Sequence, residues 1–143
     1  MARRRGKIPP PGELRVRIEV RAGSRCEYCR APQAVCGYRF HLDHIRPIVR
    51  GGSDALSNRC LACASCNLAK GDRTRAADPL TGREVSLFHP RRHVWDRHFQ
   101  WSTDRKRIVG ITPTGRATVV ALDLNDQLRV RARLLWFETG WLP

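Results

Sequence analysis

The sequence lacks long apolar segments. No run of about 18 uncharged apolar residues occurs, so we expect no membrane-spanning helix. The basic residues at the start of the chain are followed by prolines rather than by an apolar stretch, and we therefore expect no secretion signal and a cytoplasmic location. No internal repeat is visible, which argues against a solenoid.

Acidic residues are also scarce. The 13 Asp and Glu residues are outnumbered by 27 Lys and Arg residues, which gives a formal net charge of +14. A positive electrostatic potential of this size favours a polyanionic partner. Nucleic acid is the first candidate, because many weak contacts to its phosphates add up to a substantial affinity. Composition alone leaves open the alternative that the surplus charge only keeps the protein soluble.

Six cysteines in a chain with this expected location favour a metal site over disulfides. Cys26 and Cys29 form one CxxC pair, and Cys63 and Cys66 form a second. Two intervening residues let a tight turn aim both thiolates at one metal, so two pairs complete a closed tetrahedral zinc site. We predict that this zinc is structural and stabilises a small core. Two redox or disulfide motifs remain the alternative. The other cysteines are predicted to be small buried hydrophobic residues: Cys36 and Cys60.

The segment between the two pairs predicts a strand and a turn. Leu42, Ile45 and Ile48 indicate a partly buried strand that ends near Pro47. The glycine pair at 51–52 predicts a sharp turn. The elements expected next are a return strand that includes residues 60–62 and a helix over residues 64–71.

Two residues in the first of these strands suit phosphodiester hydrolysis, which needs an activated water and a cation on the phosphate. Asp43 offers a hard oxygen ligand for Mg²⁺ or Mn²⁺, and His44 offers an imidazole, a side chain that accepts protons near neutral pH. Neighbouring strand residues face opposite ways, so the two reach one phosphate only from a strand end or a bulge.

Residues 24–73, about a third of the chain, resemble the HNH endonucleases, whose catalytic unit is the ββα-metal fold. The likeness is carried by the two CxxC pairs, the DHIRP motif, the GG loop, the Asn that follows this loop and the CNLAKG sequence, all in this order. The resemblance implies that His44 is the general base, that Asp43 and Asn67 hold Mg²⁺ or Mn²⁺, and that Asn58 orients the loop and His44. The last residue of the HNH motif is a histidine, and this sequence has Asn67 at that position. The amide oxygen of Asn67 still suits a hard cation.

The implied function is that of a metal-dependent endonuclease that hydrolyses DNA, expected to be double-stranded, by a one-metal mechanism. It would leave 5′-phosphate and 3′-hydroxyl ends. The alternatives are a non-catalytic zinc-dependent nucleic-acid-binding module and a protein that uses its cysteine pairs for protein contacts. The candidate DNA contacts are Lys70, Arg73 and His41. For the first two a solvated basic face is the alternative, and for His41 a partly buried strand histidine.

The predicted fold class is α+β, with a ββα-metal (His-Me finger) core held by the four-cysteine zinc site and a mixed α/β C-terminal extension. We expect a basic flexible arm over residues 1–12, a nuclease domain over 13–75 and an extension over 76–143 that packs on it. Residues 13–22 read as a short helix, although their alternating apolar residues also fit a strand.

Within the extension the sequence predicts two helices and a hairpin. The expected elements are a linker or turn over 75–82, a hairpin of 99–101 with 107–111, a turn at TPTG, and helices over 116–124 and 126–138. The tryptophans are expected to form its apolar centre: Trp95, Trp101, Trp136 and Trp141. Three histidines lie outside the HNH-like segment, and the alternative that one replaces the missing motif histidine stays open: His89, His93 and His98.

Overall fold

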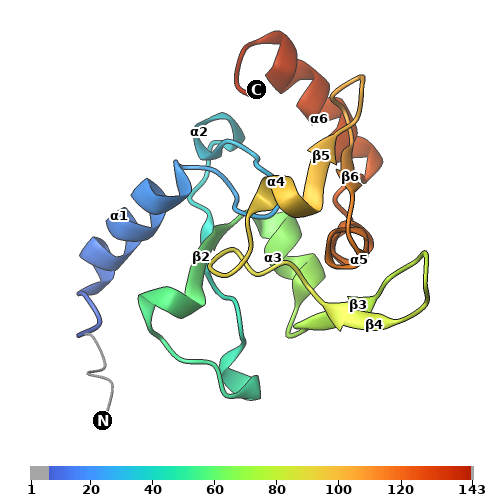
Figure 1. Ribbon diagram of the computed structural model, residues 1–143. Coiled ribbons are helices and arrows are strands. Elements are labelled where there is room, and N and C mark those ends of the chain that lie inside the picture. Colours follow the sequence, from blue (N-terminus) through green and yellow to red (C-terminus); the bar gives the residue numbers. More distant parts are fainter. Residues whose placement is uncertain (1–6, 143) are drawn as a thin grey trace.

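The computed structural model describes residues 7–142 and confirms the mixed α and β composition predicted from the sequence (Figure 1). Residues 1–6 of the predicted arm lie outside the described residues, and the first helix begins at Pro11, inside the predicted arm. Among residues 7–142, no helix has the length and apolarity that a membrane span requires.

Helices and short antiparallel hairpins alternate along the chain. The helices are α1 (Pro11–Ala22), α2 (Gln33–Cys36), α3 (Ala64–Lys70), α4 (Trp95–His98), α5 (Pro113–Ala121) and α6 (Gln127–Glu138). The strands pair as β1 (His41–His44) with β2 (Arg59–Ala62), β3 (Arg75–Ala77) with β4 (Glu84–Ser86), and β5 (Phe99–Trp101) with β6 (Ile108–Gly110). Two 3₁₀ turns, η1 (Ile48–Arg50) and η2 (Leu56–Asn58), lie in the loop between β1 and β2.

The segment that the sequence allowed as a helix or a strand is a helix, α1. Leu14, Ile18 and Ala22 recur every fourth residue and are buried, whereas Val16 and Val20 are exposed. A strand would have buried alternate residues instead. The buried stripe of α1 packs against β2, and this contact covers one side of the β1–β2 hairpin.

The predicted order of strand, loop, strand and helix is present between the two cysteine pairs. Asp43 lies opposite Cys60 in the register of β1 and β2, and α3 follows directly after β2. Strand β1 ends at His44, three residues before the predicted end at Pro47, because the chain turns there toward η1. Asp43 and His44 therefore lie at the end of a strand, which is one of the two positions expected of neighbouring residues that reach one phosphate.

The extension differs from the prediction at two places. Residues 75–82, expected to be a linker or turn, form strand β3 followed by the turn of a hairpin with β4, so the turn is confirmed and the strand was not predicted. Helix α5 begins at Pro113 instead of Arg116, because the Thr112 hydroxyl accepts a hydrogen bond from Gly115 N at 3.0 Å and Pro113 fits the first turn. The predicted TPTG turn is therefore the start of a helix. The hairpin β5–β6 and helix α6 lie where they were predicted.

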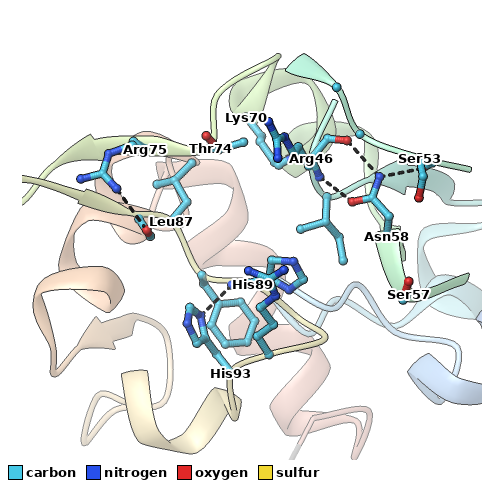
Figure 2. Close-up of a pocket in the computed structure, with 16 residues that line it drawn as sticks. Arg46, Ser53, Ser57, Asn58, Lys70, Thr74, Arg75, Leu87, His89 and His93 are labelled. Atoms are coloured by element: carbon cyan, nitrogen blue, oxygen red, sulfur yellow. Dashed lines mark hydrogen bonds between the residues drawn. The ribbon is translucent and has the colours of Figure 1, made fainter. Parts of the chain in front are cut away.

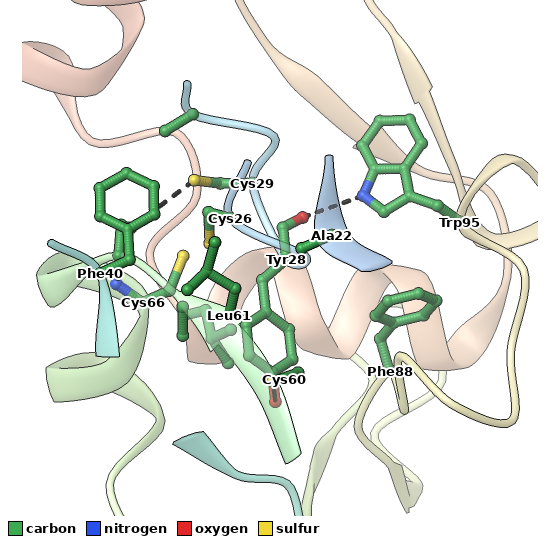
Figure 3. Packing of buried hydrophobic residues seen from close by; sticks show 14 of the residues in the cluster. Ala22, Cys26, Tyr28, Cys29, Phe40, Cys60, Leu61, Cys66, Phe88 and Trp95 are labelled. Carbon is green, nitrogen blue, oxygen red and sulfur yellow. Dashed lines mark hydrogen bonds between the residues drawn. The ribbon is translucent and has the colours of Figure 1, made fainter. Parts of the chain in front are cut away.

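One hydrophobic core joins the Cys-rich part to the extension (Figure 3). Trp95 is buried, and its indole N–H donates to the backbone oxygen of Tyr28 at 2.9 Å. Trp101 and Trp136 are half-buried against the same core. Trp141 is 44% exposed, so the prediction that all four tryptophans are central is wrong for this residue near the chain end.

A buried carboxylate fastens the β3–β4 hairpin to α5. The side chain of Asp78 is fully buried, and both of its oxygens accept hydrogen bonds at 2.9 Å from the guanidinium of Arg116. The hydrogen bonds from Arg116 hold the pKa of Asp78 far below its usual range. A group with a lowered folded-state pKa stabilises the fold above its unfolded-state pKa and loses this effect as the pH falls.

We predict that Asp78→Asn lowers the melting temperature by several degrees at pH 7, because it removes the charge that Arg116 faces. The difference in melting temperature between the variant and the parent protein becomes smaller as the pH falls below about 4, where the aspartate of the unfolded chain takes up its proton. Thermal unfolding followed by circular dichroism between pH 3 and 7 tests this. The exposed Asp96 supplies the control variant Asp96→Asn. An equal effect of both substitutions would contradict the assignment.

Candidate active site

The four paired cysteines form one compact buried cluster. The sulfur atoms of Cys26, Cys29, Cys63 and Cys66 all lie within 4.8 Å of one another, and the Sγ atoms of Cys29 and Cys63 are 3.7 Å apart. A tetrahedral ion with metal–sulfur bonds of about 2.3 Å separates its sulfurs by about 3.8 Å, whereas a disulfide brings them to about 2.05 Å. No cysteine in the described chain is disulfide-bonded. The cluster therefore fits a metal ion such as zinc.

The extension contributes a cation to this cluster. Arg129 of α6 donates from Nη2 to the Sγ atom of Cys66 at 2.8 Å. Four thiolates around a divalent ion carry a formal charge of two minus, and the guanidinium offsets part of it. Helix α6 is thereby tied to the cysteine cluster.

The two remaining cysteines do not belong to the cluster. Cys60 is fully buried in the core, and Cys36 is half-buried against it, as expected of small hydrophobic residues. Burial raises the pKa of the Cys36 thiol to about 11, so it stays protonated at neutral pH and is a poor metal ligand.

His44 is held by a carboxylate that sequence reasoning missed. Its Nε2 lies 2.7 Å from Oδ1 of Asp54, and the Arg59 guanidinium lies 3.2 Å from the same oxygen. The hydrogen bond from His44 lowers the pKa of Asp54, and Arg59 adds to this effect. An ionised carboxylate only accepts hydrogen bonds, so Nε2 carries the proton and Nδ1 of the neutral ring is left as an acceptor. No spacing rule joins two residues that lie on opposite sides of an irregular loop, so the sequence carries no signal for this pair.

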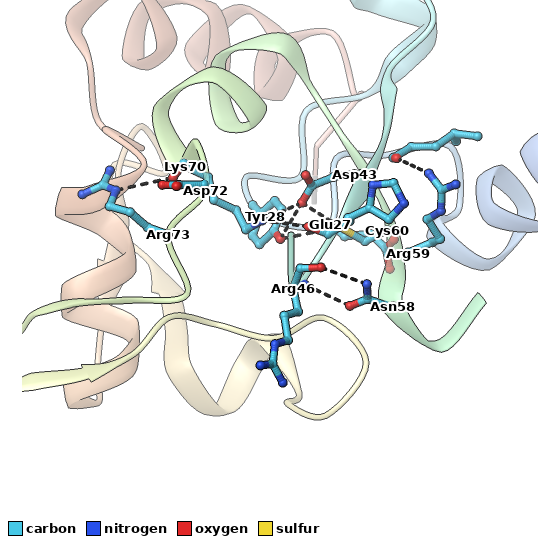
Figure 4. A network of polar contacts seen from close by, with 12 residues as sticks. Glu27, Tyr28, Asp43, Arg46, Asn58, Arg59, Cys60, Lys70, Asp72 and Arg73 are labelled. Carbon is cyan, nitrogen blue, oxygen red and sulfur yellow. Dashed lines mark hydrogen bonds and ion pairs between the residues drawn. The ribbon is translucent and has the colours of Figure 1, made fainter. Parts of the chain in front are cut away.

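Asp43 lies in a network of buried polar groups (Figure 4). Its Oδ2 accepts hydrogen bonds from Lys70 Nζ at 3.0 Å and from the Tyr28 hydroxyl at 3.2 Å, with the Cys60 thiol at 3.8 Å. All three contacts fall on Oδ2. Within residues 7–142, Oδ1 has no hydrogen-bond partner, so one hard oxygen remains for a cation.

Lys70 is buried, so it does not form the solvated basic face that was the alternative for this residue. Its side chain is 2% exposed, and Nζ contacts Asp43 Oδ2 and the backbone oxygen of His44. Helix α3 packs this residue against β1, where a buried ammonium is stable only when it is paired and hydrogen-bonded. Lys70 therefore fixes the end of β1 from the helix side.

The other two candidate DNA contacts also have defined positions. Arg73 donates from Nη2 to the backbone oxygens of Ala69 and Ala121, so its guanidinium joins the end of α3 to the end of α5. The residue remains exposed to solvent, as the solvated-face alternative expects. His41 is exposed at the start of β1, two residues before Asp43 and on the same face of the strand.

Asn58 fixes the loop that carries Asp54. Its Nδ2 donates to the backbone oxygens of Arg46 and Ser53 at 3.0 and 2.7 Å, while its Oδ1 accepts from Arg46 N at 2.9 Å. Gly52 permits this closure, because a Cβ there would lie 1.7 Å from the Arg46 oxygen. The loop-orienting part of the expected role of Asn58 thus corresponds to contacts in the structure.

Asn67 lies on α3 three residues before Lys70, which places both on one side of the helix. Lys70 reaches Asp43 and the backbone of His44 from this side. In the described chain no hydrogen bond joins the Asn67 side chain to either of them. The structure brings Asp43, His44 and Lys70 into contact and places Asn67 about one helical turn before Lys70 on α3.

The histidines of the extension do not join this cluster. His93 Nδ1 accepts from His89 N at 2.9 Å, and His98 Nδ1 lies 2.7 Å from the Thr112 hydroxyl. Between residues 7 and 142, the four cysteines are the only group of three or more candidate metal ligands. No observation therefore favours a histidine of the extension as the replacement for the motif histidine.

We predict that Cys66→Ser abolishes binding of the metal ion at the cysteine cluster and the cooperative unfolding transition of the chain, because metal binding and folding are coupled in such sites. Elemental analysis of the purified protein and thermal unfolding by circular dichroism measure both effects. Cys36→Ser is the matched control and retains one ion per chain. A Cys66→Ser protein with the parent's metal content and stability would rule out a metal-dependent fold.

Comparison with known proteins gives one match. Residues 26–73 match the model of the HNH endonuclease family. Neither a search of curated proteins nor a search of solved structures finds a significant match. The matched segment starts at the first cysteine of the cluster and ends three residues after Lys70, so it contains β1, β2, α3 and every residue of the candidate site. Residues 26–73 of this chain are therefore similar to the HNH endonuclease family.

Proposed function

We propose that the protein is an endonuclease that hydrolyses phosphodiester bonds of double-stranded DNA with one Mg²⁺ or Mn²⁺ ion and His44 as the general base. The ion at the cysteine cluster is zinc, and its role is structural because four thiolates leave no open coordination position. The match of residues 26–73 to a family of nucleases and the net charge of +14 support a nucleic-acid substrate.

The observation that carries this proposal is the orientation of His44 by Asp54. The carboxylate 2.7 Å from Nε2 fixes the ring and leaves Nδ1 to take a proton from water. When the water loses its proton, the imidazolium that forms is stabilised by the adjacent Asp54 charge. Asn58 keeps the loop of Asp54 in place, so the base is held before substrate arrives.

The residues that would hold the catalytic cation are Asp43, whose Oδ1 accepts no hydrogen bond in the described chain, and Asn67. Both are hard oxygen donors of the kind that Mg²⁺ and Mn²⁺ prefer. The bound cation would polarise the scissile phosphate and stabilise the charge that develops on the leaving oxygen. Lys70 holds Asp43 by its other oxygen, which leaves Oδ1 available.

A second candidate function is a non-catalytic nucleic-acid-binding module with the same fold. The Lys70 ammonium on Asp43 favours it, because a buried cation beside the carboxylate offsets the charge that would attract a divalent ion. In such a module the Asp43–Lys70 pair only stabilises the contact between β1 and α3. The two functions differ in whether DNA is cut when a divalent ion is supplied.

We predict that the purified protein nicks supercoiled plasmid in the presence of Mg²⁺ or Mn²⁺, and that His44→Ala lowers the rate at least about 100-fold. DNA binding, measured by mobility shift, and thermal stability stay close to those of the parent. Reactions without added divalent ion are the control, since a chelator would also strip the cysteine cluster.

Two outcomes count against this proposal, the first against cleavage and the second against His44 as the base. A parent protein that binds DNA but never cuts it establishes the non-catalytic module. Cutting by His44→Ala at the parent rate shows that another group activates the water.

We further predict that Asp54→Asn lowers kcat about tenfold or more without changing KM for plasmid, because the neutral amide no longer stabilises the imidazolium. Asp72 lies in the same domain with a similarly exposed side chain, 61% against 55% for Asp54, so Asp72→Asn is the matched control. Asp54→Asn activity equal to that of Asp72→Asn would remove Asp54 from the mechanism.

A further inference from the structure

A cleft of about 500 Å³ lies between the HNH-like segment and the extension (Figure 2). One wall comes from the loop after β1 and includes Arg46 and Asn58. The facing wall comes from residues 74–75 and 86–93, and Lys70 lies at the junction of the two walls. The cleft thus exists only because the extension packs on the HNH-like segment.

The cleft is lined by hydrogen-bond donors and positive charge. Its basic residues are Arg46, Lys70, Arg75 and Arg92, its hydroxyl groups are those of Ser53, Ser57, Thr74 and Ser86, and no Asp or Glu lines it. Lys70 is already paired with Asp43. The guanidinium groups cannot accept a hydrogen bond or lose their charge. The lining therefore selects an anion that offers several acceptor oxygens.

Two histidines in the cleft are also held as donors. Nδ1 of His89 accepts a hydrogen bond from Arg91 N at 3.2 Å, and Nδ1 of His93 accepts one from His89 N at 2.9 Å. Each neutral ring must therefore carry its proton on Nε2. Burial lowers the pKa of both side chains, so the rings are neutral at pH 7 and still donate.

The lining of the cleft includes direct neighbours of the candidate catalytic residues. Ile45 and Arg46, the next two residues after His44, lie in its wall, and Lys70 in the same lining contacts Asp43 and the backbone of His44. A DNA strand with its scissile phosphate at His44 would therefore pass close to this cleft.

We propose that the cleft binds the backbone phosphates that flank the scissile phosphate of the cut DNA strand, with Arg75, just after the matched segment, and Arg92 of the extension as their principal partners. This inference rests on the proposed function. It assigns the extension a role in substrate binding. Because phosphates carry no base identity, the cleft contributes affinity without sequence preference.

Binding of a fluorescein-labelled 20-base-pair duplex, followed by anisotropy without divalent ions, tests this separately from cleavage. We compare the parent with Arg75→Gln/Arg92→Gln and with a control, Arg107→Gln/Arg131→Gln, which removes the same charge from exposed arginines outside the cleft. The cleft variant weakens binding at least about fivefold more than the control. Its slope of log K against log salt falls by about one for each phosphate that the variant no longer neutralises.

Arg92→Gln alone guards against a folding defect, since Arg75 also donates to Ser86 and to the backbone of Glu84. It lowers the salt slope by about one with unchanged thermal stability. Equal affinity and equal slope in the cleft and control variants overturn the inference even if the parent cuts DNA. A parent that fails to cut while the cleft variants bind weakly overturns only the catalytic proposal.

Discussion

Convergence of four sulfur atoms is the constraint on which the rest of the structure depends. It fixes residues 26–29 against residues 63–66, so the loop and hairpin between them must close on themselves. Helix α3 starts inside the cluster, with Cys63 as its N-cap. The orientation of α3 and the position of Lys70 against β1 follow from this start. The extension is also attached to the cysteine cluster, through the hydrogen bond from Arg129 to Cys66.

The site built on this constraint is held from two sides. From the helix side, Lys70 holds the Asp43 carboxylate and the end of β1. From the loop side, Asn58 closes the loop of Asp54, and Asp54 holds His44. The proposed base and the proposed metal ligand are neighbours in sequence, yet separate parts of the fold fix them. Because their supports are separate, Asp43 and His44 can both be held in place at the end of the short strand β1.

The cysteine cluster and the ββα order were predictable because each depends on local spacing. CxxC pairs aim two sulfurs at one point, and the glycine pair and Gly71 mark turns that few other residues allow. The burial of Lys70 and the bond from Asp54 to His44 were not predictable in this way. Both depend on how a helix and a loop pack after folding, and no period in the sequence encodes that packing. The start of α5 was missed because a threonine cap and a proline fit both a turn and a first helical turn.

Catalysis as proposed requires a divalent cation held by Asp43 and Asn67 beside His44. A crystal of the protein soaked in Mn²⁺, with data collected to record anomalous scattering, measures where such an ion binds. We expect an anomalous peak within about 2.5 Å of Asp43 Oδ1 and of the Asn67 amide oxygen. A well-ordered crystal with no peak at Asp43, or with Lys70 still the only cation there at saturating Mn²⁺, would contradict this mechanism.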